Sequence, residues 1–116
     1  MTLSERIEKS LAKIAPITPS WNEADEHCIV YTFDLEGGAY GDDEPGCAVA
    51  NLEVHLYAPV GLDIAAEIVS VTHVLMDEIE STFPSVTNGS TLNYQHFTFL
   101  CRVILPIEEM IGFGEI

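Results

Sequence analysis

Residues 61–82 read GLDIAAEIVSVTHVLMDEIEST and carry the strongest helical pattern in the chain. Apolar residues recur there at steps of three and four, so they share one side of a helix, while polar residues occupy most other positions. This apolar stripe consists of Ile64, Ile68, Val71, Leu75 and Ile79. Asp63 is a candidate cap for the first turn, and Pro84 should end the helix because proline disfavours helical backbone in the preceding residue. We therefore expect an amphipathic helix that covers a sheet.

The rest of the chain predicts one more helix and a set of strands. A second apolar stripe predicts an amphipathic helix over residues 2–15, which Pro16 ends. Alternation of apolar and polar residues predicts strands over residues 27–36, 47–58, 85–92 and 95–105. The first two strands should pair antiparallel as a hairpin, and Asn88-Gly89 is a turn signal inside the third.

The order of these elements favours one two-layer domain. Helix, strand, strand, helix, strand, strand is most simply packed as an α+β domain. In it, one antiparallel sheet of about four strands (β-β-α-β-β) carries the N-terminal and central helices. In the strand over residues 47–58, Asn51, Glu53, His55 and Tyr57 alternate with apolar residues, so that strand should be half exposed. We expect a single domain over residues 1–116, with residues 107–116 either a flexible tail or a segment docked on a neighbour.

The charge of the chain is strongly acidic. Nineteen acidic residues face four Lys and Arg residues, which gives a formal net charge of −15, and Arg102 is the only one of these bases after Lys13. Such a surface repels nucleic-acid phosphates and anionic membranes. The mean hydropathy is nevertheless positive, a combination that suggests apolar area hidden in an oligomer.

No catalytic or metal-binding motif is evident. The sequence has no P-loop, GxGxxG, GxSxG, HExxH or CxxC pattern. Its four histidines are scattered, at residues 27, 55, 73 and 96, and their spacing from acidic residues indicates no acid–base pair. The cysteines at 28, 47 and 101 are far apart and are expected to be reduced, buried thiols. We therefore expect no enzyme, and no catalytic, cofactor-binding or metal-ligating residues.

The loop between the first two strands holds the strongest candidate for a functional segment. It is rich in glycine and contains three consecutive acids, Asp42, Asp43 and Glu44. Three carboxylates in a loop could hold Mg²⁺ or Ca²⁺ with a nearby histidine, although the alternating ligands of an EF-hand are absent. On this reading the chain is a small acidic metal- or ligand-binding domain. The alternative is a solvated, charge-repelling hairpin tip.

The segment CIVYTFDLEGGAYGDDEPGCAVANLEVHLYAPVG, residues 28–61, resembles the centre of small tail-completion proteins of long-tailed bacteriophages and prophages. The shared features are an aromatic strand, an acidic loop and a strand that ends in x-V-x-L-Y-x-P. In this chain they are Tyr31-Thr32-Phe33, Gly41-Asp42-Asp43-Glu44-Pro45 and Glu53-Val54-His55-Leu56-Tyr57-Ala58-Pro59. The resemblance continues through the central helix to the His96 strand and covers roughly residues 5–105. Residues 91–95 depart from the family, whose members often carry acids there.

The resemblance implies a tail terminator or head–tail joining protein. Subunits of such families form a ring, usually of six, that caps the tail tube and offers a docking surface to the filled head. The implied partners are further copies of the chain, the tail-tube protein and a head-completion or connector protein, while DNA passes through the lumen without specific binding. The implied location is the virion tail, after assembly in the host cytoplasm. The assembly interface is expected to include Gly41, Asp42, Asp43, Glu44 and Pro45.

Overall fold

The computed structural model describes residues 2–20, 27–37 and 47–106. Within these residues the chain forms two helices and four strands in the predicted order, and the predicted α+β class is confirmed. The elements are α1 (Leu3–Leu11), β1 (Cys28–Gly37), β2 (Cys47–Pro59), α2 (Ala65–Asp77), β3 (Ser85–Asn88) and β4 (Tyr94–Pro106). The predicted tail, residues 107–116, lies outside the described residues.

The sheet has the strand order β1-β2-β4-β3, and each neighbouring pair is antiparallel. β1 and β2 form the predicted hairpin, with Cys28 opposite Tyr57. β4 pairs along the other side of β2, from Tyr94 opposite Pro59 to Pro106 opposite Cys47. The short β3 pairs only with β4. As a result β2 and β4, which are far apart in sequence, lie side by side along their whole length.

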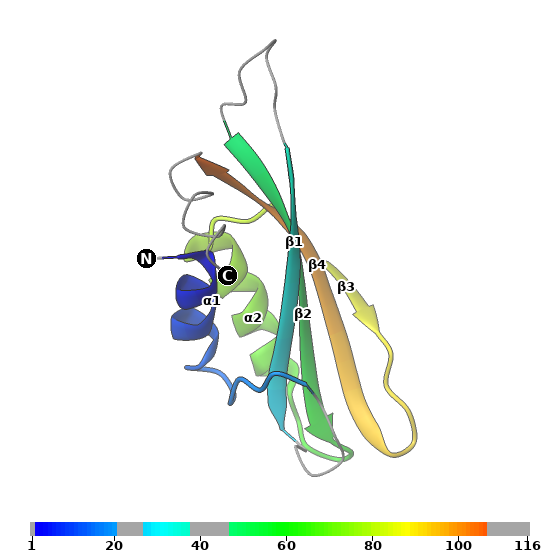
Figure 1. Cartoon of the computed structure of the whole chain (residues 1–116). Helices are drawn as coiled ribbons and strands as arrows, with labels where there is room; N and C mark the ends of the chain where they lie inside the picture. The colour runs from blue at the N-terminus through cyan, green and yellow to red at the C-terminus, as the bar shows by residue number, and fades with distance from the viewer. Residues whose placement is uncertain (1, 21–26, 38–46, 107–116) are drawn as a thin grey trace.

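Both helices pack on the same face of the sheet (Figure 1). Alternate strand residues point into this layer, and their burial is the main favourable contribution to folding. The buried core includes Leu3, Ile7, Ile29, Leu52, Val54, Leu56, Val71, Leu75, Phe99, Val103 and Leu105. Cys28 and Cys101 are buried and neither belongs to a disulfide, as predicted for these two cysteines.

Helix α1 begins where the sequence predicts and ends earlier. The Thr2 hydroxyl accepts a hydrogen bond from the Glu5 N–H at 3.2 Å, and the Glu5 carboxylate accepts one from the Thr2 N–H at 3.2 Å. This capping box satisfies two of the free N–H groups of the first turn. Beyond Leu11 the backbone tightens, because the Ile14 N–H bonds to the Leu11 carbonyl, three residues back. The predicted end at residue 15 is therefore wrong. Pro16 disfavours helical backbone in the residue before it, so the helix cannot continue up to the proline.

Helix α2 is shorter at both ends than the stretch over residues 61–82. Asp63 lies just outside the helix, and its carboxylate accepts a hydrogen bond from the Ala65 N–H at 3.1 Å. At the other end Glu80 has a positive φ of 62°, and the Ser81 N–H bonds to the Leu75 carbonyl at 2.9 Å. This bond reaches six residues back, one more than the bond of a Schellman motif, and it closes around a left-handed residue. The helix is thus terminated near Glu80, and the prediction that Pro84 ends it is wrong.

The third strand is also shorter than predicted and stops at Asn88. The Asn88 side chain accepts a hydrogen bond from the Ser90 N–H at 2.9 Å, which makes the local turn that the Asn-Gly pair indicates. The chain then returns to pair as β4 from Tyr94. Because β4 is longer than β3, most of the length of β4 on that side has no strand neighbour among the described residues.

Candidate functional site

The face of the sheet opposite the helices is covered by no helix of the described chain (Figure 1). Residues opposite each other on antiparallel neighbours point to the same side, so the register assigns this open face row by row. Its rows are Val30, His55, Thr98 and Thr87; then Thr32, Glu53, Leu100 and Ser85; then Asp34, Asn51 and Arg102; then Glu36, Val49 and Ile104. The prediction that one face of the second strand is half exposed is confirmed.

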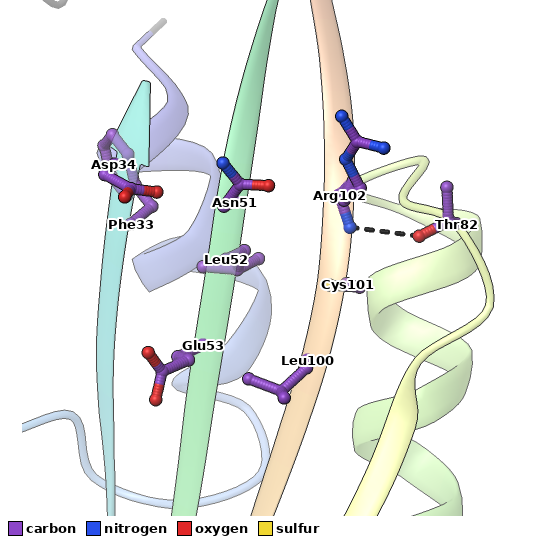
Figure 2. A pocket seen from close by; sticks show the side chains of 9 residues that line it. All are labelled: Phe33, Asp34, Asn51, Leu52, Glu53, Thr82, Leu100, Cys101 and Arg102. Carbon is purple, nitrogen blue, oxygen red and sulfur yellow. Dashed lines mark hydrogen bonds between the residues drawn. The ribbon is translucent and has the colours of Figure 1, made fainter. Parts of the chain in front are cut away.

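A hollow of about 560 Å³ lies across β1, β2 and β4 (Figure 2). Figure 2 shows Asn51 on β2 beside Arg102 on β4, with the Thr82 hydroxyl accepting a hydrogen bond from the Arg102 N–H at 3.0 Å. The Arg102 guanidinium contacts the Glu36 carboxylate at 3.2 Å, and more than half of each side chain is exposed. Such an exposed ion pair contributes little stability. The exposed Leu100 adds apolar surface beside these polar groups.

The chemistry of this hollow is weak. Its one thiol belongs to Cys101, and burial raises the pKa of that thiol. A protonated thiol is a poor nucleophile. The remaining lining residues place no base next to a nucleophile, which is the first requirement of covalent catalysis.

A cluster of polar side chains lies farther along the same face. His55 on β2 and His96 on β4 approach each other, with 2.9 Å between Nδ1 of His55 and Nε2 of His96. The Thr98 hydroxyl oxygen lies 3.3 Å from each of these two nitrogens. The other ring nitrogen of His55, Nε2, lies 3.2 Å from a carboxylate oxygen of Glu53. The cluster is thus a histidine pair with a carboxylate behind one member.

The ring of Tyr57 packs flat on His96, with centroids 4.3 Å apart and an angle of 12° between the planes. Burial lowers the pKa of His96, and the charge of His55 lowers it further. Burial likewise raises the pKa of Tyr57, with smaller contributions from Tyr94 and Cys28. Both causes acting on His96 favour the neutral imidazole at pH 7.

A separate histidine contact joins the start of β1 to α2. Nε2 of His27 lies 2.6 Å from a carboxylate oxygen of Glu67, and both side chains are partly buried. The prediction that no acid–base pair forms is therefore wrong, because Glu67 meets His27 across the fold rather than His73 on its own helix. Both side chains already satisfy each other and no third reactive group is described beside them, so we assign this pair a structural role.

An apolar hollow of about 390 Å³ lies on the helical side of the domain. It is lined by the outer face of α2, including Val69, His73 and Met76, and by Phe83 in the connection that follows. Phe83 is 75% exposed and Val69 is 56% exposed. Large apolar side chains that gather on a surface in this way make it a candidate contact surface.

No family model matches this chain, and no curated protein matches it either. Within the described residues, neither helix is long and apolar enough to cross a membrane.

The predicted interface residues Gly41, Asp42, Asp43, Glu44 and Pro45 lie outside the described residues. Among the residues that the structure does describe, no three His, Cys, Asp or Glu side chains are grouped as a metal-ligand set.

The His55–His96 pair was missed at the level of sequence. The available signal was that both histidines occupy polar positions of predicted strands. Their contact depends on β2 pairing with β4 in one particular register, with Tyr57 opposite His96 and His55 opposite Thr98. Alternation alone does not provide that register.

Proposed function

We propose that this protein is a structural, non-enzymatic subunit of a bacteriophage or prophage tail, a tail terminator or head–tail joining protein that assembles into a ring. The observation that carries the proposal is the presence of two exposed apolar surfaces on opposite sides of the domain. One is the open face of the sheet, with Leu100 and Ile104; the other is the α2 hollow, with Val69, Met76 and Phe83. The family resemblance of residues 28–61 supports the same function.

Two different surfaces are what a ring requires. A ring closes by head-to-tail contacts, in which one surface of each subunit binds a different surface of the next. In a two-layer domain, a sheet face and a helical face lie on opposite sides, so a neighbour can bind each one at the same time (Figure 1). Ile104 is 65% exposed on the first surface and Val69 is 56% exposed on the second, and burial of such side chains favours association.

The acidic charge suits a ring through which DNA passes. Six subunits would carry six times the net charge of −15, or roughly −90. A lumen of that sign repels DNA phosphates, so DNA crosses it without specific binding. The proposed partners are therefore further copies of the chain, the tail-tube protein and the head-completion or connector protein, in the virion tail after assembly in the host cytoplasm. The proposal includes no cofactor.

The test is electron microscopy and light scattering of the untagged protein, alone and mixed with the tail-tube protein. We expect rings, or tubes stopped and capped at one end. Val69→Lys and Ile104→Lys should each abolish them, because each places a charge in one of the two apolar surfaces. Val60→Lys is the matched control, since Val60 is 57% exposed but belongs to neither surface. The absence of rings and of any effect on tubes, or equal disruption by Val60→Lys, would overturn the proposal.

A further inference from the structure

We propose that His55 and His96 form a binding site for one divalent transition-metal ion, of the class that prefers imidazole ligands, on the open face of the sheet. The two ring nitrogens that face each other, 2.9 Å apart, come from neighbouring strands and are held there by the register. Imidazole nitrogen is a preferred ligand of Zn²⁺, Cu²⁺ and Ni²⁺. This site is independent of the proposed tail function and of the acidic loop.

The distances fit a metal ion in a particular geometry. Two nitrogens each about 2.1 Å from an ion are about 3.0 Å apart when they subtend a right angle, and about 3.4 Å apart in a tetrahedron. The observed separation of 2.9 Å is close to that of the right angle in square-planar or octahedral coordination. The ring centroids are 5.1 Å apart, so the two nitrogens face each other, and both rings must turn for their lone pairs to converge on one ion. Ni²⁺ and Cu²⁺ adopt such geometries, whereas Zn²⁺ would require the rings to move apart.

Glu53 prepares His55 to act as a ligand. Its carboxylate oxygen lies 3.2 Å from Nε2 of His55 and favours the proton on that nitrogen, which leaves the lone pair on Nδ1, the nitrogen that faces His96. A carboxylate behind a ligand histidine fixes the ring and makes it a stronger donor. With Nδ1 as acceptor, the proton between the two rings belongs to Nε2 of His96.

Binding of the ion requires that this proton move. The proton leaves Nε2 of His96 and is replaced on Nδ1 of the same ring, so both imidazoles stay neutral and each supplies one lone pair. Nδ1 of His96 faces Gly89, where a Cβ atom would lie 3.4 Å away. The absence of a side chain at Gly89 leaves space beside that nitrogen. A water molecule in that space can accept the Nδ1–H.

The rest of the coordination shell is supplied by water and by Thr98. The Thr98 hydroxyl lies 3.3 Å from both ligand nitrogens and forms a triangle of donor atoms with them. The site opens to solvent on the exposed face, and the chain carries a net charge of −15, which raises the local concentration of cations. Two protein nitrogens with water in the remaining positions make a site that exchanges its ion.

The experiment is isothermal titration of the untagged protein with NiCl₂, CuCl₂, ZnCl₂ and MgCl₂. We expect one ion per chain for Ni²⁺ and Cu²⁺, weaker binding of Zn²⁺, and none of Mg²⁺, which prefers oxygen ligands. His55→Gln and His96→Gln should each weaken Ni²⁺ binding at least tenfold, and the double variant should abolish it. Glu53→Gln, which touches no ion, should weaken binding about 10–100-fold. His73→Gln and His27→Gln are controls that should bind Ni²⁺ as the unchanged protein does.

Circular dichroism in the absence of metal separates lost binding from lost folding. If His96→Gln does not fold, the comparison of Glu53→Gln with His73→Gln still tests the site, because both changed residues lie on the surface. Unchanged affinity in the folded double variant would overturn the proposal, as would no binding of Ni²⁺ by the unchanged protein at millimolar concentration. Nitrogen hyperfine lines from two imidazoles in the spectrum of bound Cu²⁺ would support it, and their absence would contradict it.

Discussion

Replacement of Glu80 by glycine should stabilise this protein, although most changes of a structured residue destabilise. Glu80 adopts a φ of 62° in the turn that ends α2. A left-handed conformation costs an L-residue roughly 1–2 kcal/mol, because Cβ lies too close to the following carbonyl oxygen. Glycine does not have this cost, but its greater freedom in the unfolded chain lowers the free energy of unfolding by roughly 0.5–1 kcal/mol. The change also removes a contact of 4.0 Å between Arg6 and the 81% exposed Glu80 side chain, which contributes little.

The net gain is about 0.5–1 kcal/mol, which raises the Tm of a domain of this size by about 2–4 °C. Thermal and urea unfolding measure it directly. Glu80→Asn should give part of the same gain, since asparagine tolerates the left-handed region better than glutamate. Ala66→Gly is the control: Ala66 is an exposed residue in the first turn of α2, and glycine there should destabilise by up to about 1 kcal/mol. If Glu80→Gly lowers the free energy of unfolding as Ala66→Gly does, the helix does not end in a left-handed turn at Glu80.

Three further changes test the core, the histidine pair and the predicted loop. Phe99→Ala should lower the free energy of unfolding in urea by about 3–5 kcal/mol, because Phe99 is fully buried. Phe83 is 75% exposed, so Phe83→Ala should change that free energy by no more than about 0.5 kcal/mol. Similar losses in the two variants would contradict the placement of the core. Because folding lowers the pKa of His96, the unfolded chain binds a proton at this residue more readily than the folded chain does. The free energy of unfolding should therefore fall as the pH drops below 6.5. This part of the pH dependence should disappear in His96→Gln, and an unchanged profile would contradict it. Asp42→Lys with Asp43→Lys should abolish ring or cap formation in electron microscopy without a change in Tm; intact assembly would remove the loop from the interface.

The layers and faces of this fold were predictable because they follow from the periods of apolar residues. Ile64, Val71, Leu75 and Ile79 are buried on one side of the α2 region, and Phe99, Cys101, Val103 and Leu105 are buried on one face of β4, as the alternation predicts. Burial of these side chains is the largest favourable contribution to folding, and the spacing of apolar residues in the sequence indicates which side chains are buried.

The helix ends and the histidine pair were not predictable in the same way. The left-handed turn at Glu80 contains no glycine, so Pro84 was the nearest helix-stop signal in the sequence. The contact of His55 with His96 depends on a pairing between strands that are not consecutive in the chain. A shift of the register by one residue would place one histidine on the helical face. Local sequence patterns do not exclude such a shift, whereas packing of the core does.

Charge and apolar surface together determine what can drive self-association of this domain. Two copies with a net charge of −15 repel each other, and Arg102, the only Lys or Arg residue after Lys13, already contacts Glu36. Ion pairs between copies therefore cannot supply much of the free energy, since the chain lacks the bases to form them. In the proposed ring, burial of the two apolar surfaces would supply it instead. The acids would act in the opposite direction: they disfavour every arrangement that brings like charges together, and so would favour contacts that bury Ile104 and Val69 while keeping the carboxylates apart.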